Sequence, residues 1–147
     1  MTRDEFLVYL NLLSSNKDHD RINEFITDDI TLEFYNGVTL EEHKSKVLHG
    51  RGEYIAHFKA LHAKIREFLD LGFFLCDGKN AVVELYVEFH ALEDSDSALS
   101  AGKLEKGKAY CATHWVCYDL TPEGKFSRVR IAHHMSHYTP PIHDPRK

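Results

Sequence analysis

The sequence contains only three cysteines in 147 residues, and no apolar run in it approaches the ~20 residues that a membrane-spanning helix needs. If Cys111 and Cys117 share a strand, they lie about 20 Å apart at ~3.3 Å per residue, which is too far for a disulfide. The first residues, MTRDEFLVYLNLL, also lack the pattern of a secretory or mitochondrial targeting segment. We therefore expect free thiols and a cytoplasmic protein.

An excess of positive charge is missing as well. The chain has 18 lysines and arginines against 23 acidic residues, a net charge of -5 with histidine neutral, and the two signs alternate along the sequence. This balance argues against a nucleic-acid groove and against binding to an anionic membrane surface. Hydrophobic residues make up 43% of the chain, as in ordinary globular proteins, and the length is that of one domain, 1–147.

The first part of the chain changes between helical and strand periodicity. Apolar residues recur every three or four positions over 6–13, which predicts an amphipathic helix, and a second short helix is expected from Asp18 or Asp20. Over 30–35 the period is two, which predicts a strand that ends in a turn at Asn36-Gly37. Residues 39–48 are ambiguous. A third helix follows Gly50, with its apolar face formed by Ile55, Phe58, Leu61, His62 and Ile65.

The second part of the chain consists of strands, predicted over 68–76, 81–92, 108–120 and 126–138. The polar connection 93–108 has a length typical of lids and binding loops. After the last strand, three prolines in TPPIHDPRK prevent the sheet from continuing. Helices followed by antiparallel strands indicate an α+β fold, with the helices packed against one face of a curved sheet.

This order of elements, with the segments FITDDITLEFYNG, GRGEYIAHFKAL and YDLTPEGKFSRVRI, resembles the nuclear transport factor 2-like (NTF2-like) superfamily over about residues 6–138. The resemblance implies a cone, or cystatin-like α+β barrel, in which a curved antiparallel sheet wraps around three N-terminal helices and encloses a pocket. The DDITLE segment resembles ketosteroid isomerases and SnoaL-like polyketide cyclases. KDHDRI and the His114-Trp115 pair are more similar to scytalone dehydratase.

None of these families' mechanisms carries over whole. Ketosteroid isomerases place a general-base aspartate where this chain has Phe34, and Glu33 points to the other face if the strand is regular. Their oxyanion-site aspartate falls at His114. Scytalone dehydratases carry a Tyr-Asp pair where this chain has Ser14 and Ser15. The Asp-Arg-Asp set of limonene-type epoxide hydrolases has no counterpart at the predicted inward strand positions.

Histidine is abundant, with 11 residues, and it exchanges protons near neutral pH. The resemblance places His114 and His133 on neighbouring strands, both facing one apolar cavity, with His137 nearer its mouth. Two such histidines can act as general base and general acid, and the hydroxyls of Tyr110 and Tyr118 can donate to a developing enolate. A second interpretation stays open, in which the two histidines are core residues bonded to each other or to the backbone.

The pocket implied around these groups is apolar with a few polar groups. Its expected substrate-binding residues are Tyr9, Phe34, Phe58, His62, Leu85, Val87, Phe89, Val129, Ile131, Met135 and His137. For His62, packing of the third helix is the expected role. A metal shared by His133 and His137 would require a helix, since on a strand they lie ~13 Å apart. We therefore expect neither a metal nor another cofactor.

Two functional hypotheses follow. The first is a cofactor-independent lyase or isomerase of secondary metabolism, a dehydratase, isomerase or cyclase acting on a small hydrophobic oxygenated molecule, which the resemblance suggests is polyketide- or terpenoid-like. The second is a non-catalytic ligand-binding or dimerisation module of the same fold.

Surface positions suggest a homodimer. The convex face of the sheet is expected to carry Glu84, Tyr86, Glu88, His90 and Trp115, and an exposed tryptophan there suits an interface between two copies. Four other histidines, in polar or loop contexts, are expected to be exposed: His19, His43, His49 and His143.

Overall fold

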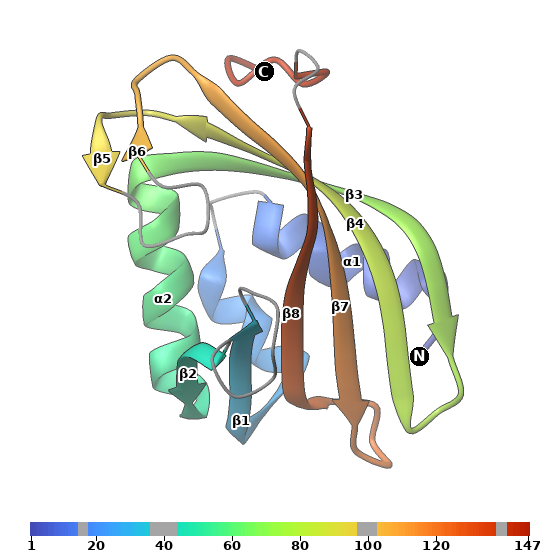
Figure 1. Cartoon of the computed structure of the whole chain (residues 1–147). Coiled ribbons are helices and arrows are strands. Elements are labelled where there is room, and N and C mark those ends of the chain that lie inside the picture. The colour runs from blue at the N-terminus through green and yellow to red at the C-terminus, as the bar shows by residue number, and fades with distance from the viewer. Residues whose placement is uncertain (15–17, 36–43, 97–102, 138–140) are drawn as a thin grey trace.

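The structure is a computed structural model of the whole chain, and it describes residues 1–14, 18–35, 44–96, 103–137 and 141–147 (Figure 1). Side chains at positions 44, 45, 96, 103 and 133–137 lie outside that description. The predicted turn at Asn36-Gly37 and the expected exposure of His43 also fall outside the described residues.

Helical segments in the described part are α1 (Arg3–Ser14), the 3-10 helix η1 (His19–Glu24) and α2 (Gly50–Lys64). The first and third predicted helices are confirmed, and the second is a single short 3-10 helix. At the start of α1, the Thr2 hydroxyl accepts a hydrogen bond from the amide of Glu5, and the Glu5 carboxylate accepts one from the amide of Thr2. This reciprocal capping satisfies two backbone donors that the helix itself leaves without a partner.

A six-stranded sheet has the order β2-β1-β8-β7-β4-β3. Its strands are β1 (Ile26–Tyr35), β2 (Lys44–His49), β3 (Ile65–Cys76), β4 (Asn80–Ala91), β7 (Ala109–Leu120) and β8 (Phe126–His137). All neighbours are antiparallel except β1 and β8, which run parallel. A separate pair, β5 (Ser95–Asp96) and β6 (Lys103–Leu104), lies in the long connection predicted over 93–108. The predicted strands are confirmed. β2 covers 44–48 of the ambiguous stretch 39–48, and 39–43 lie outside the described residues.

The sheet curves around the helices and is not closed, because β2 and β3 are its two edges (Figure 1). α1 packs against β3 and α2 against β1 on the concave face. Fully buried side chains that fill this space include Phe6, Tyr9, Leu10, Ile30, Leu32, Tyr54, Val83 and Phe126. The predicted α+β cone, an open curved sheet wrapped around helices, is therefore confirmed.

The alternation of β8 is broken by a bulge next to a predicted catalytic residue. His114 on β7 pairs with His133, yet the preceding Thr113 pairs with Met135, so β8 carries one extra residue at this point. Met135, and His137 two residues further on, therefore pair with positions of the β7 face opposite to that of His114. The strict alternation predicted through 129–137 is wrong beyond His133.

Cys111 and Cys117 lie on one strand, as expected, and Cys76, Cys111 and Cys117 are free thiols. In the described ranges, the helices are too short or too polar to cross a bilayer.

Candidate active site

The last turn of α2 and the beginning of β3 bring together two buried polar side chains. Nε2 of His62 lies 2.6 Å from Oε2 of Glu67, and the exposed fractions of the two residues are 6% and 5%. Because α2 ends at Lys64 and the chain turns directly into β3, side chains only five positions apart can meet. His62 therefore packs α2 against β3, as expected, and also makes a buried hydrogen bond there.

A second imidazole extends this pair towards the surface. Nε2 of His19, on η1, lies 2.8 Å from Nδ1 of His62, and the two rings are stacked with centroids 5.1 Å apart. His19 is half-buried, so its expected exposure is wrong. Partial burial, together with the nearby His62 and Lys59, lowers the pKa of His19, which favours its neutral form at neutral pH.

The hydrogen-bond directions follow from the chemistry of the three groups. When Glu67 is ionised it only accepts, so His62 donates through Nε2–H. Nδ1 of His62 then carries a lone pair and accepts from Nε2–H of His19. Glu67, His62 and His19 form a continuous chain from a buried carboxylate to a half-buried imidazole, here called the proton chain.

Three tyrosine hydroxyls, each from a different element, lie close together on the concave side of the sheet and are here called the tyrosine cluster. The hydroxyl of Tyr9 on α1 lies 2.5 Å from that of Tyr54 on α2, and Tyr9 is also hydrogen-bonded to Tyr118 on β7. All three residues are at most 3% exposed. Burial raises the pKa of each hydroxyl above its ordinary value, so each remains a protonated donor at neutral pH.

The proton chain and the tyrosine cluster lie within electrostatic range of each other. The negative charge of Glu67 adds to the raised pKa of both Tyr54 and Tyr118, after the larger effect of burial. Glu67 also pairs with Phe89 in the β3–β4 ladder, and the Phe89 ring centroid is 6.3 Å from that of His114. Phe89 is thus next to Glu67 in the sheet and close to the ring of His114.

The predicted catalytic histidines occupy directly paired positions of β7 and β8. His114 is half-buried, and the side chain of His133 lies outside the described part of the chain. Tyr110 is half-buried, with its ring stacked 6.1 Å from that of Phe89. The arrangement of the two imidazoles relative to each other stays a prediction.

Most of the predicted substrate-binding residues belong to the concave side. Buried members are Tyr9, Phe58, His62, Leu85, Val87, Phe89 and Val129, and half-buried members are Phe34 and Ile131. The Phe34 ring lies 5.2 Å from the ring of His57 on α2. Burial, reinforced by Lys46 and His62, lowers the pKa of His57 to about 4. The side chains of Met135 and His137 lie outside the described residues.

Glu33 confirms the regular alternation of β1. It points to the convex face, where its carboxylate accepts hydrogen bonds from Arg128 and from the Tyr35 hydroxyl. A buried carboxylate on the concave side comes from another strand, at Glu67 of β3.

Sequence reasoning missed Glu67, His19 and Tyr54. Extending the third strand back to Ile65 would have placed Glu67 in the alternating series of inward positions. Tyr54 precedes Phe58 and His62 at intervals of four, which indicates a shared helix face. His19 has no such signal, because its contact depends on how η1 packs against α2.

Known proteins resemble this chain in structure and not in sequence. No family model matches the sequence, and no curated protein matches it. Among solved structures, the epoxide hydrolase/cyclase-like enzyme SalBIII, described for pyran ring formation in the polyether salinomycin, is similar with a TM-score of 0.68 and 21% identity, over 90% of each chain.

Two other solved structures show the same architecture. A SnoaL-like polyketide cyclase from Agrobacterium tumefaciens has a TM-score of 0.67 and 17% identity, covering 91% of this chain and 93% of its own. An NTF2-like protein from Anabaena variabilis has a TM-score of 0.63 and 16% identity, covering 90% of this chain and 85% of its own. With the open curved sheet around its helices, this chain has the NTF2-like α+β fold that SnoaL-like polyketide cyclases share.

Proposed function

We propose that this protein is a cofactor-independent acid–base enzyme that acts on a small hydrophobic, oxygenated molecule by dehydration, isomerisation or cyclisation. The proton chain of Glu67, His62 and His19 beside the tyrosine cluster is the observation that carries the proposal. The similar fold of a polyketide cyclase and of an epoxide hydrolase/cyclase-like enzyme supports this class of reaction.

Glu67 acts electrostatically on two members of the tyrosine cluster, Tyr54 and Tyr118. A proton that binds Nδ1 of His19 can shift one proton along each hydrogen bond, from His19 to His62 and from His62 to Glu67. The carboxyl group is then protonated, and the reverse shift restores the carboxylate. A buried carboxylate can in this way exchange its proton with solvent without being exposed.

The reaction needs a base and a group that stabilises the developing negative charge. Glu67 removes a proton from the carbon next to a carbonyl, and a neutral tyrosine hydroxyl donates to the oxygen on which charge builds up. His114, whose ring lies near that of Phe89, supplies the second acid or base that the sequence predicts, together with His133. General acid–base catalysis of this kind contributes about 10²–10⁴-fold in rate per group.

Hydrogen–deuterium exchange at carbon tests this function without a known product. The protein is incubated in D2O with a panel of cyclic ketones and β-hydroxy ketones, and loss of the proton signal next to the carbonyl is followed by NMR. We expect exchange of at least one probe, and we expect Glu67→Gln to slow it about 10²-fold or more.

Glu33→Gln is the matched control, because it neutralises another buried glutamate on the opposite face of the sheet. It should retain the exchange activity of the unmodified protein. If probes bind but none exchanges, or if Glu67→Gln and His114→Ala both retain full activity, the enzyme proposal fails and the non-catalytic binding module becomes the better description.

A further inference from the structure

The segment 141–147 lies on the outer face of the sheet, on the side away from the helices, where it contacts β3 and β4. On this face Glu88 is 0% exposed, although its strand neighbours Val87 and Phe89 are the ones that point into the core. The segment therefore covers a carboxylate that the sheet alone would leave facing solvent.

Glu88 binds the backbone of this segment directly. Its Oε1 accepts from the amide of Ile142 at 2.6 Å, and its Oε2 accepts from the amide of His143 at 3.2 Å. The sheet itself supplies further donors, the hydroxyl of Tyr86 at 2.8 Å and Nε2 of His90 at 2.7 Å. Burial on its own raises the pKa of Glu88, but these hydrogen bonds outweigh it and hold the pKa below its ordinary value, so the group is charged at neutral pH.

The imidazole of His143 makes a second attachment. Its Nε2 lies 2.5 Å from Oδ2 of Asp70, and its ring is stacked on Phe68 with a centroid distance of 4.5 Å and an interplanar angle of 4°. Phe68 pairs with Glu88 in the β3–β4 ladder, and Asp70 pairs with Tyr86. These adjacent positions on one face form a continuous surface, here called the outer docking site.

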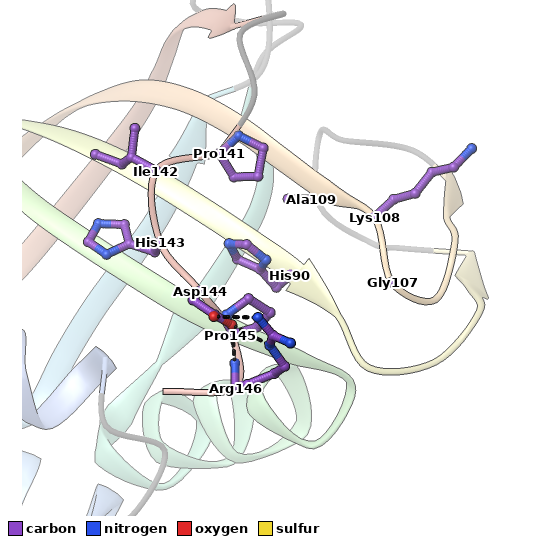
Figure 2. Close-up of a pocket in the computed structure, with 10 residues that line it drawn as sticks. All are labelled: His90, Gly107, Lys108, Ala109, Pro141, Ile142, His143, Asp144, Pro145 and Arg146. Carbon is purple, nitrogen blue, oxygen red and sulfur yellow. Dashed lines mark hydrogen bonds and ion pairs between the residues drawn. The ribbon is translucent and has the colours of Figure 1, made fainter.

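Hydrogen bonds and one ring contact hold the segment in place, with little apolar burial. Ile142, its largest apolar side chain, is 75% exposed. Beside it runs an open groove of about 690 Å³ whose walls include His90, Lys108 and Pro141 (Figure 2). Asp144 and Arg146 bond to each other within the segment. Asp144 also interacts electrostatically with His90 on β4. The segment is therefore attached through hydrogen bonds to two carboxylates and one ring contact, and it buries little apolar surface of its own.

We propose that Phe68, Asp70, Tyr86 and Glu88 form a peptide-docking site whose occupant is this chain's own segment 141–147, recognised through two consecutive amides and one imidazole, and that the segment leaves the site reversibly. The pattern of recognition is specific, because a carboxylate accepts paired backbone donors while an aromatic ring and a second carboxylate select histidine. Release opens the outer face around Glu88 to other molecules.

Amide hydrogen exchange of the full chain, followed by NMR, tests the proposal. In the unmodified protein the amides of Ile142 and His143 should be protected, but should exchange faster than the amides of β4. We expect His143→Ala to speed exchange at Ile142 about tenfold, as for the loss of one charge-assisted hydrogen bond, with no change in β4. Glu88→Gln should have a larger effect, and Arg146→Ala, which removes the ion pair with Asp144 inside the segment, should have none.

A competing peptide provides the second arm. An unlabelled synthetic peptide PIHDPRK in excess should speed exchange of Ile142 in the labelled protein, and the same peptide with alanine in place of histidine should not. If exchange at Ile142 is as slow as in β4 and unaffected by His143→Ala and by the peptide, the segment is a permanent part of the fold and the proposal fails. It also fails if Ile142 exchanges at the rate of an unstructured chain. His143 is half-buried, so its expected exposure is wrong, but it lies on the outer face of the sheet and its replacement should disturb folding less than Glu88→Gln.

Discussion

Nε2 of His62 lies 2.6 Å from the Glu67 carboxylate, and both residues are almost completely buried. Removing either polar group from water is costly, so the pair persists only because each satisfies the other. His19 completes the arrangement on the solvent side of His62. The hydrogen bonds that satisfy Glu67 and His62 in the core also connect the Glu67 carboxylate, through His19, to the surface.

Substitution of the pair should show strong coupling. We expect Glu67→Ala to lower the free energy of unfolding by about 2–4 kcal/mol, because it leaves the buried imidazole of His62 without its acceptor. The double variant with His62→Ala should lose less than the sum of the two single losses, by about 0.5–3 kcal/mol. Urea unfolding of the four proteins measures this, and strictly additive losses would contradict the direct bond.

Tyrosine ionisation should be incomplete in the folded protein. The chain has seven tyrosines, and burial raises the pKa of Tyr9, Tyr54, Tyr86 and Tyr118 above the ordinary value. At about pH 11 these hydroxyls should remain protonated until the protein unfolds. Absorbance at alkaline pH, compared with that of the urea-unfolded chain, measures the difference. Seven tyrosines that ionise together in the folded state would contradict the buried cluster.

Stability should fall at mildly acidic pH because of His57. Its pKa is about 4 in the folded chain against an ordinary value of 6.5. Above pH 6.5 the group is neutral in both states, and below that pH the unfolded chain binds a proton that the folded chain does not bind until about pH 4. This residue alone therefore lowers stability by at most ~3 kcal/mol between pH 6.5 and 4. His57→Gln should flatten the pH dependence, whereas replacement of the exposed His49 should leave it unchanged.

Thiol reactivity should divide the three cysteines into two classes. Cys111 is 3% exposed, and burial raises the pKa of its thiol, whereas Cys76 and Cys117 are half-buried. Since the thiolate is the reactive form, we expect Cys111 to react most slowly with an aromatic disulfide reagent. Mass spectrometry of the labelled protein identifies the site, and rapid labelling of Cys111 in the folded protein would argue against its burial.

Pairing of two copies through the convex face remains a prediction, although Trp115 is half-buried and not exposed as expected. Phe73 and Leu75 are 49% and 60% exposed, and the Phe73 ring lies 6.2 Å from that of Trp115. Apolar side chains gathered in this way favour an interface. Sedimentation should show a dimer that Phe73→Asp converts to a monomer. If the protein sediments as a monomer at all concentrations, the dimer hypothesis is wrong.

The helices, the strands and the face of each strand residue were largely predictable because they depend on local backbone geometry. The positions of Phe34 and Glu33 on opposite faces of β1 follow from alternation alone, and so does the inward series from Val83 to Phe89. The bulge in β8 was not predictable, since an extra residue in one strand is visible only against its partner strand.

The sequence by itself determined the α+β architecture, the apolar concave face and the abundance of proton-exchanging side chains. The tertiary structure alone decided which of these side chains meet: Glu67 with His62, His62 with His19, and Glu88 with the amides of the segment 141–147. The physical reason is that periodicity is a property of one segment, whereas a buried polar group must find its partner wherever the packed chain brings one within hydrogen-bond distance.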